Sequence, residues 1–341
     1  MFTSSVNIPN NIIISRADSI GDVVLTLPVA TILKKYFPHI KIAFLGKAYT
    51  RSVIEACTSI DLFIDADAFM TEEIKIFGEK PEAIIHVLPV RKIASRAYHL
   101  KIPLRIGTTN RVFHWLTCNK LVKLSRKNSL LHEAQLNVKL LQPFGITHSF
   151  SLDELGYAFG LENIKPLAPQ FISLIDQHKY NLILHPKSQG NGREWGIENF
   201  IKLIELLDLQ KFKIFISGIA KEREMLEPLF KAAGEKVTDI TGLMNLDAFI
   251  SFIAVCNGLI ASGTGPLHLA AALGKDAFGI YPPLRPIHPG RWAPLGPKAK
   301  AFVVNRSCTD CKKNKVACHC IAEVDPLWLQ ESLTNAYSKM H

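Results

Sequence analysis

Three polar loops of the chain carry residue types that handle protons and negative charge. The first, residues 15–22, contains Arg16, Asp18, Gly21 and Asp22. Glycine lets the backbone pass close to a ligand, and the free N–H groups at the start of a helix favour an anion. Asp18 is therefore a candidate general base that takes a proton from a hydroxyl group. The alternative is that Asp18 or Asp22 only caps the following helix.

The second loop, residues 185–195, follows a strand-like run and contains Lys187, Ser188 and Arg193. The two cations can offset the charge of a diphosphate without a metal ion, and the serine can donate a hydrogen bond. The loop therefore predicts a diphosphate site, although an ordinary surface loop has the same composition.

The third loop, residues 262–272, contains the turn Gly263-Thr264-Gly265-Pro266 and then His268. Such a turn presents backbone N–H groups to a phosphate, and the dipole of the following helix adds to the attraction. His268 is either part of this site or a core histidine. The turn lacks the third glycine of a dinucleotide fingerprint and the lysine of a P-loop, which disfavours hydride transfer and ATP hydrolysis.

A cysteine cluster near the end of the chain is the fourth feature. Its spacing is Cys308-x2-Cys311-x6-Cys318-x-Cys320. Two close thiolate pairs suit tetrahedral zinc, so we expect a structural zinc site, with His319 as an alternative ligand. A redox-sensitive cluster with a facultative disulfide and an inert loop are the other interpretations.

Predicted strands and helices flank these loops. Apolar runs of strand length alternate with segments of helical spacing, as in parallel sheets with helical crossovers. We expect strands at 11–15, 40–45, 61–64, 83–88 and 104–107, and helices at 22–36, 48–57, 91–99 and 132–144. After an irregular segment at 147–179, we expect strands at 181–185, 213–217, 236–240, 258–261 and 277–281, and helices at 197–208, 220–233, 246–256, 265–273 and 326–339.

This repeated plan predicts an α/β protein with two Rossmann-like doubly wound domains facing across a cleft, with ligands at the carboxyl ends of the strands. We place the domains at 1–165 and 166–325, followed by a helix at 326–341 that could pack on the first domain. The length of 341 residues agrees with two domains. A hydrophobic fraction of 48% excludes a disordered or low-complexity chain.

The positive charge is concentrated in one stretch. The net charge is +10, and residues 83–150 contain eleven Lys and Arg but a single acid, Glu133, whereas the rest of the chain carries 29 residues of each sign. A local excess of this kind predicts a face for a polyanion, namely nucleic acid, phospholipid head groups or a phosphorylated glycolipid. The alternative is a solvated charged surface.

Targeting signals are not expected. The first 15 residues lack the cationic flank and long apolar run of a secretion signal, and the uncharged run 248–274 is broken by polar residues. The seven cysteines, an odd number, do not suggest a disulfide scaffold. These features predict a cytoplasmic protein without a transmembrane helix.

Together, the three loops resemble glycosyltransferase family 9, the ADP-heptose:lipopolysaccharide heptosyltransferases. The resemblance covers nearly the whole chain: Arg-x-Asp-x-Ile-Gly-Asp-Val-Val-Leu-Thr-Leu-Pro at 16–28, Lys34 with Pro38, the loop after His185, Gly218 to Glu222, and Gly263 to His268. It implies a GT-B fold in which the N-terminal domain binds the acceptor and the C-terminal domain binds the sugar nucleotide. It also implies an inverting transfer that requires no metal.

The resemblance assigns roles to individual residues. Asp18 matches the catalytic base, Arg193 or Lys187 would stabilise the leaving diphosphate, and Glu222 matches the carboxylate that holds the ribose. The donor-binding set implied is Ser188, Glu222, Thr264, Gly265, Pro266 and His268. The basic stretch fits a phosphorylated lipid A and inner-core acceptor, with Arg91, Arg96, Arg105, Arg111 and Lys120 as candidate ligands.

We therefore expect a cytoplasmic transferase, peripherally associated with the inner face of the inner membrane, that moves a heptose from ADP-heptose to the lipopolysaccharide inner core. Nucleic acid is not an expected partner. One departure is Gly263, where many members of the family have aspartate. The alternatives are a transferase for a UDP- or GDP-linked sugar and a two-domain sugar-nucleotide epimerase. A two-lobed solute-binding protein lacks support, because no export signal is expected.

Overall fold

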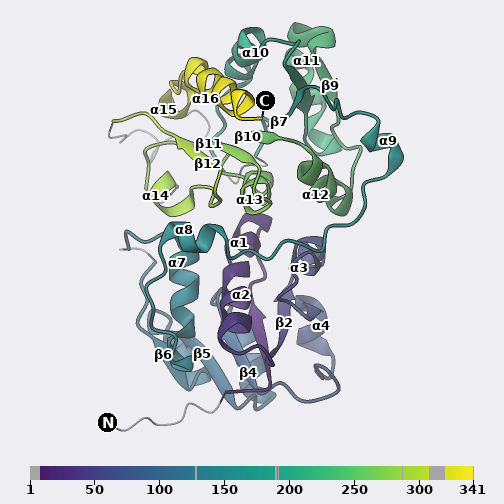
Figure 1. Ribbon diagram of the computed structural model, residues 1–341. Coiled ribbons are helices and arrows are strands. Elements are labelled where there is room, and N and C mark those ends of the chain that lie inside the picture. Colours follow the sequence, from purple (N-terminus) through teal and green to yellow (C-terminus); the bar gives the residue numbers. More distant parts are fainter. Residues whose placement is uncertain are drawn as a thin grey trace. The chain divides into compact units, whose positions relative to one another are not determined.

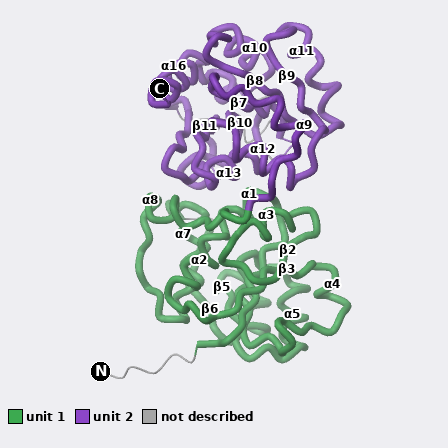
Figure 2. The backbone as a smooth tube through the Cα atoms, turned by 45° about the vertical axis from the view of Figure 1, so that its right-hand side comes forward, with its two compact units in different colours: residues 1–163 green, residues 164–341 purple. Residues whose placement is uncertain are grey.

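The chain forms two compact units, residues 1–163 and residues 164–341 (Figure 2). The computed structural model describes residues 8–126, 129–188, 190, 192–285, 287–306 and 319–340. Each unit is built around a six-stranded sheet in which every strand pair is parallel (Figure 1).

The sheet of unit 1 has the strand order β3-β2-β1-β4-β5-β6, which is the order of a doubly wound nucleotide-binding fold. Its strands are β1 (Asn11–Ser15), β2 (Lys41–Gly46), β3 (Leu62–Asp65), β4 (Ala83–His86), β5 (Leu104–Thr108) and β6 (Lys120–Val122). The chain order reverses between β1 and β4, where Ser15 is the register partner of His86. In open parallel sheets this switch point is where ligands bind.

Unit 2 repeats this topology. Its sheet order is β12-β11-β10-β7-β8-β9. The strands are β7 (Tyr180–His185), β8 (Phe212–Ile216), β9 (Val237–Asp239), β10 (Gly258–Ser262), β11 (Asp276–Ile280) and β12 (Ala299–Phe302). The switch point lies between β7 and β10, where His185 is paired with Ala261. The alternation of strands and helices that occurs twice in the sequence therefore corresponds to a strand order that occurs in both units.

Helices of unit 1 connect the strands. They are α1 (Ile20–Val24), α2 (Leu27–Tyr36), α3 (Arg51–Glu55), α4 (Ala66–Thr71), α5 (Arg91–His99), α6 (Val112–Thr117), α7 (Glu133–Val138) and α8 (Leu152–Gly156), with 3₁₀ turns η1 (Ala48–Thr50) and η2 (Lys139–Phe144). The expected helix at 22–36 is two helices, because Pro28 stands in the first turn of α2 and lacks the N–H that would continue α1. Pro143 similarly lies in η2, which replaces the end of the expected helix at 132–144.

Helices of unit 2 are α9 (Pro169–Ile172), α10 (Ile197–Leu206), α11 (Glu227–Ala233), α12 (Leu246–Val255), α13 (Gly265–Ala272), α14 (Pro289–Trp292), α15 (His319–Ala322) and α16 (Pro326–Ser338). The 3₁₀ turns are η3 (Ala220–Glu222), η4 (Glu224–Leu226) and η5 (Gly234–Lys236), so the expected helix at 220–233 begins as two 3₁₀ turns. α16 packs against α10, and Leu329 and Leu333 lie in the core of unit 2. α16 therefore packs on unit 2, and the expected packing on the N-terminal domain stays a prediction.

Apolar strands form the two cores. All five residues of β1 are buried, including Ile12, Ile13 and Ile14 at 0% exposure, as expected for a central parallel strand covered on both faces. The core of unit 2 includes Leu182, Leu184 and Trp195, whose indole Nε1 donates to Val324 O at 2.8 Å. A rigid sheet therefore supports the loop that follows β1, and another supports the loop that follows β7.

Candidate functional site

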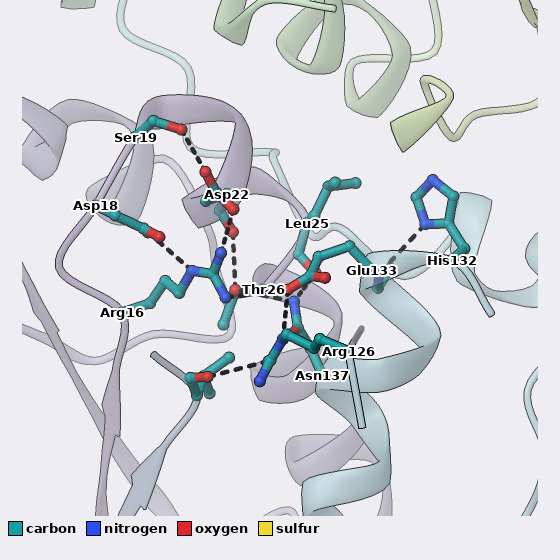
Figure 3. A network of polar contacts seen from close by, with 12 residues as sticks. Arg16, Asp18, Ser19, Asp22, Leu25, Thr26, Arg126, His132, Glu133 and Asn137 are labelled. Atoms are coloured by element: carbon teal, nitrogen blue, oxygen red, sulfur yellow. Dashed lines mark hydrogen bonds and ion pairs between the residues drawn. The ribbon is translucent and has the colours of Figure 1, made fainter. Parts of the chain in front are cut away.

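Arg16 organises the loop that follows β1. Its side chain is 4% exposed and contacts three carboxylates. Nε donates to Asp18 Oδ1 at 2.8 Å, one terminal nitrogen contacts Asp22, and the other lies 3.3 Å from Glu133 Oε1 (Figure 3). Ser19 Oγ donates to the second oxygen of Asp22 at 2.5 Å. A single buried cation thus fixes the orientation of the two loop carboxylates.

Asp18 has the environment of a general base. Burial raises the pKa of Asp18 to about 6; the Arg16 guanidinium opposes this shift, and the nearby Asp22 carboxylate adds to it. Its side chain remains 28% exposed, so a substrate hydroxyl can reach it. The Tyr49 hydroxyl donates to the Asp18 carbonyl at 2.6 Å and holds the backbone of the loop. A carboxylate of this kind is ionised at neutral pH and is more basic than an ordinary aspartate.

Helix capping does not explain Asp18. The N-cap residue of α1 is Ser19, and no side chain makes a capping hydrogen bond there. Asp22 lies in the first turn of α1, where it accepts from Ser19 and Arg16. The capping alternative is therefore wrong for Asp18, whose carboxylate bonds Arg16.

Glu133, the first residue of α7, connects this loop to the basic segment. It is 1% exposed and accepts Arg126 Nε at 2.9 Å as well as contacting Arg16. Arg126 also donates to Val87 O at 3.0 Å, just after β4, and to Asn137 Oδ1 at 2.9 Å. Asn137 donates in turn to Leu25 O at 3.0 Å (Figure 3). These contacts join the loops after β1 and β4 into one polar network at the switch point.

The candidate acceptor ligands fall into two groups. Arg96 donates to Phe69 O at 3.3 Å and Glu72 O at 2.8 Å. Arg105 donates to Thr117 O at 2.7 Å and to Ile102 O. These two guanidinium groups anchor backbone. By contrast, the exposed members of the set are Arg91, Arg111 and Lys120.

In unit 2, Glu194 orders the loop that follows β7. It forms an ion pair with Lys187, which is 12% exposed. Its Oε1 accepts the Ser188 N–H at 3.0 Å and the Ser188 hydroxyl at 3.2 Å. The Lys187 charge is therefore already shared with a carboxylate, a partner that the sequence did not indicate. Arg193, from the same loop, is half-buried.

Glu222 lies at the end of η3, in the segment after β8. It is buried, and its Oε2 accepts the Ile219 N–H at 2.9 Å. A Cβ at Gly218 would stand 3.0 Å from this carboxylate oxygen, so glycine there leaves room for it. The turn thus holds a buried carboxylate near the carboxyl end of β8, beside the strand that carries the Lys187 loop.

The turn after β10 begins α13. Thr264 is the N-cap residue, and Gly265 and Pro266 form the first turn. The Thr264 hydroxyl is buried and has no hydrogen-bond partner among the residues that the structure describes, and Thr264 as a whole is 8% exposed. A buried hydroxyl normally finds a partner, so a ligand oxygen here would satisfy it. His268, one turn further on, is 4% exposed.

The Tyr281 ring packs against Gly263 and occupies the space that a side chain would need there. A Cβ at Gly263 would lie 2.8 Å from the Tyr281 ring, which is closer than side-chain carbons approach one another. The ring is 2% exposed, and its hydroxyl donates to Trp292 O at 2.6 Å. An aspartate at this position would therefore require Tyr281 to move, so the departure from the family pattern is built into the packing of this unit.

The profile of glycosyltransferase family 9 (heptosyltransferase) matches residues 92–322. The match covers more than half of the chain and parts of both units. The chain belongs to glycosyltransferase family 9. The resemblance that the loops carried in the sequence is thereby confirmed.

Individual proteins that are similar to this family 9 enzyme include heptosyltransferases. The lipopolysaccharide core heptosyltransferase OpsX of Haemophilus influenzae is 22% identical over 283 residues, which are 80% of this chain and 79% of that protein. The structure of E. coli ADP-heptose LPS heptosyltransferase II matches with a TM-score of 0.72, 16% identity and coverage of 97% and 99%. E. coli heptosyltransferase WaaC with ADP matches with a TM-score of 0.70, 15% identity and coverage of 96% and 99%. The predicted GT-B fold class is thus confirmed.

The zinc prediction for this glycosyltransferase rests mostly on residues outside the described ones, namely Cys308, Cys311 and Cys318. Cys320 is described, is buried in α15 and accepts Arg306 at 3.3 Å. Across the described ranges, no group of three or more His, Cys, Asp and Glu side chains is arranged to hold a metal. Zinc therefore stays a prediction, and metal analysis of the purified enzyme, with one zinc per chain expected, tests it.

Sequence reasoning missed the supporting residues of the transferase. Glu133 was noted only as the single acid of the basic stretch, and neither Arg126 nor Glu194 was assigned a role. A signal for Glu133 existed, since it is the single acid between residues 83 and 150. Within the described part of the chain, none of the helices combines the length and apolarity that a membrane span requires.

Proposed function

We propose that this transferase moves a heptose from ADP-heptose to the lipopolysaccharide inner core, with inversion at the anomeric carbon and without a metal ion. The observation that carries the proposal is Asp18, a carboxylate with a raised pKa, held at the switch point of a doubly wound unit and still open to solvent. Two relatives support the choice of donor and acceptor, because one is an ADP-heptose LPS heptosyltransferase and the other a lipopolysaccharide core heptosyltransferase.

In the proposed reaction, the acceptor hydroxyl attacks the anomeric carbon while its proton passes to the Asp18 carboxylate. A new carbon–oxygen bond forms on the face opposite the leaving group, and the bond to the diphosphate breaks, so that ADP departs. Arg16 holds Asp18 in place through the 2.8 Å contact. General-base assistance of this kind commonly contributes about 10²–10⁴ in rate.

We assign donor binding to unit 2. The N–H groups at the start of α13 favour a diphosphate, as does the Thr264 hydroxyl, which has no partner among the described residues. Gly265, Pro266 and His268 would complete this donor site. Ser188 lies at the neighbouring strand end, because β7 and β10 are adjacent. Arg193 and Lys187 would offset the charge of the leaving group, with Glu194 sharing the Lys187 charge until the donor arrives. Glu222 would accept hydrogen bonds from the two ribose hydroxyls.

The acceptor is assigned to unit 1, which carries the positive charge. Arg91, Arg111 and Lys120 are exposed and can reach phosphates, whereas Arg96 and Arg105 would support them by fixing backbone. For a lipid-linked acceptor, we expect the enzyme to work from the cytoplasm at the inner face of the inner membrane.

One observation favours a second candidate, a transferase for another nucleotide sugar. Gly263 replaces the aspartate that many family members carry, and Tyr281 occupies the adjoining space. If that aspartate recognises heptose hydroxyls, this chain recognises its sugar differently while keeping the diphosphate turn. Titration calorimetry with ADP, UDP, GDP and NAD separates the candidates. Selective ADP binding supports the proposal, a preference for UDP or GDP changes the sugar, and no binding contradicts the donor site.

The transfer itself is tested with purified inner-core acceptor and ADP-heptose. We expect a product that contains one more heptose, and release of an equal amount of ADP. NMR should show that the transferred heptose has the anomeric configuration opposite to that in the donor. Conversion of the sugar nucleotide in the absence of acceptor would instead support the epimerase alternative.

A further inference from the structure

Three large apolar side chains of α6 face solvent together. Val112 is 82% exposed, Trp115 62% and Leu116 77%. Positions i, i+3 and i+4 lie on one face of a helix, so the three form one apolar patch. Single exposed apolar residues are common on protein surfaces, but three on one turn mark an interaction site. These residues are called the α6 patch below.

The α6 patch is held in place from beneath. His114, on the opposite side of the helix, is fully buried, and its Nδ1 accepts the Thr108 N–H at 2.9 Å. The Trp115 indole donates to Thr109 O at 3.0 Å, so its polar atom is already satisfied within the protein. Arg105 fixes the end of the helix through Thr117 O at 2.7 Å. The apolar exposure is therefore a feature of an ordered helix.

Exposed cationic residues flank the α6 patch along the chain. Residues 83–132 contain ten Lys and Arg and no Asp or Glu. Arg111 directly precedes α6, Lys120 begins the edge strand β6, and Lys123 follows that strand; all three are exposed. Apolar side chains that include a tryptophan, within a cluster of cations, are what an anionic bilayer surface binds.

Charge also argues against the other occupants. A second copy of the chain would bring a second acid-free, cationic segment to the same surface. Nucleic acid would engage the cations and leave the aliphatic side chains of Val112 and Leu116 in water. Only a surface that is both anionic and apolar just beneath its charges satisfies both observations.

We propose that the α6 patch and the flanking Arg111, Lys120 and Lys123 form a membrane-binding face whose partner is a bilayer that contains anionic phospholipid. This face deepens the proposed function, since it rests on a lipid-linked acceptor for its purpose. A ring contact and a strand pairing connect α6 to the loop that carries Asp18. The His114 ring lies 5.6 Å from that of His86, and His86 is the register partner of Ser15, the residue before Arg16.

Vesicle co-sedimentation of the full chain tests the face. Wild type should bind phosphatidylcholine vesicles that contain phosphatidylglycerol and should bind pure phosphatidylcholine far less. Salt at about 0.5 M should weaken binding, because exposed charges are then screened. Leu116→Ser and Trp115→Ser should each lower partitioning about tenfold, the loss expected for one inserted apolar side chain. Trp328→Ser is the matched control, since Trp328 is 43% exposed in unit 2.

Three outcomes would overturn the proposal. Unchanged vesicle binding by both α6 variants removes the patch from the interface, and equal binding to neutral vesicles removes the role of charge. A wild-type dimer that Leu116→Ser converts to a monomer shows that the patch is a contact between copies. A deacylated, water-soluble acceptor separates this proposal from the proposed function. Leu116→Ser should transfer heptose to it at the wild-type rate, whereas failure of the wild type to do so would contradict only the proposed function.

Discussion

Replacing Asp18 by asparagine should make the enzyme more stable and nearly inactive. The pKa of Asp18 is raised from 3.8 to about 6, chiefly by burial, so the folded state resists ionisation of this carboxyl. A shift of roughly two units corresponds to about 3 kcal/mol, and since the side chain is 28% exposed, solvent screening reduces the expected gain to about 1–3 kcal/mol. Asparagine removes the charge and keeps an oxygen that can accept from Arg16.

The sign of the effect defines its pH range. A carboxyl whose pKa is higher in the folded state binds more protons there, so its ionisation costs no stability below about pH 3.8 and the full amount above about pH 6. The free energy of unfolding of Asp18→Asn should therefore exceed that of the wild type by an amount that grows by about 2 kcal/mol between pH 4 and pH 7. Urea unfolding of both proteins at several pH values measures it. Asp153→Asn, an exposed aspartate of α8, is the matched control and should change stability by less than about 0.5 kcal/mol at each pH.

Activity is the second readout. The rate of transfer should fall about 10³-fold in Asp18→Asn, as expected for loss of a general base, while ADP affinity stays within about twofold because donor binding is assigned to unit 2. In the wild type, kcat/KM should rise with pH through about 6 and then level off. If the variant is no more stable at pH 7.5, the carboxylate is not desolvated. If it retains turnover, Asp18 is not the base.

Three further substitutions test other parts of the site. Glu222→Ala should weaken ADP binding about tenfold by calorimetry, because hydrogen bonds to a carboxylate are lost. Glu133→Gln should lower the free energy of unfolding by about 3 kcal/mol and reduce kcat, because it removes the buried charge that pairs with Arg16 and Arg126. His86→Leu should flatten the loss of stability in acid. Burial lowers the pKa of His86 to about 3, so the folded protein binds fewer protons than the unfolded chain between pH 3 and 6.5 and loses about 1 kcal/mol per pH unit there as the pH falls.

Matched surface variants control these tests. Glu224→Ala, on the exposed side of the same segment, should leave ADP affinity unchanged. Glu55→Gln removes an exposed i,i+4 ion pair with Arg51 and should cost less than about 0.5 kcal/mol. His39→Leu, on the surface, should leave the acid dependence of stability as it is. Equal effects in a test variant and its control would contradict the assigned role.

The sequence predicted the elements whose signals are local. The helix expected at 91–99 is α5, because its apolar positions have helical spacing, and the buried strands β1 and β7 were found within one residue as continuous apolar runs. The helix α6 and strands β6 and β12 were missed. Each is short, and β6 and β12 lie at sheet edges, where fewer apolar side chains are needed. Because α6 also has apolar residues on its exposed face, its sequence lacks the alternation of apolar and polar faces that predicts a helix.

Asp18 could be proposed from the sequence because a parallel sheet places the carboxyl ends of its strands at one edge, whatever the helices do. Its raised pKa could not, since it depends on burial and on Asp22 together. The contact between Arg16 and Glu133 spans 117 residues and exists only because α7 returns to the switch point. A lone acid within a basic segment is still informative. Burying Glu133 at 1% exposure is costly unless cations contact it, so the folded chain must bring cations to it. These include Arg126 and Arg16, the arginine that holds Asp18.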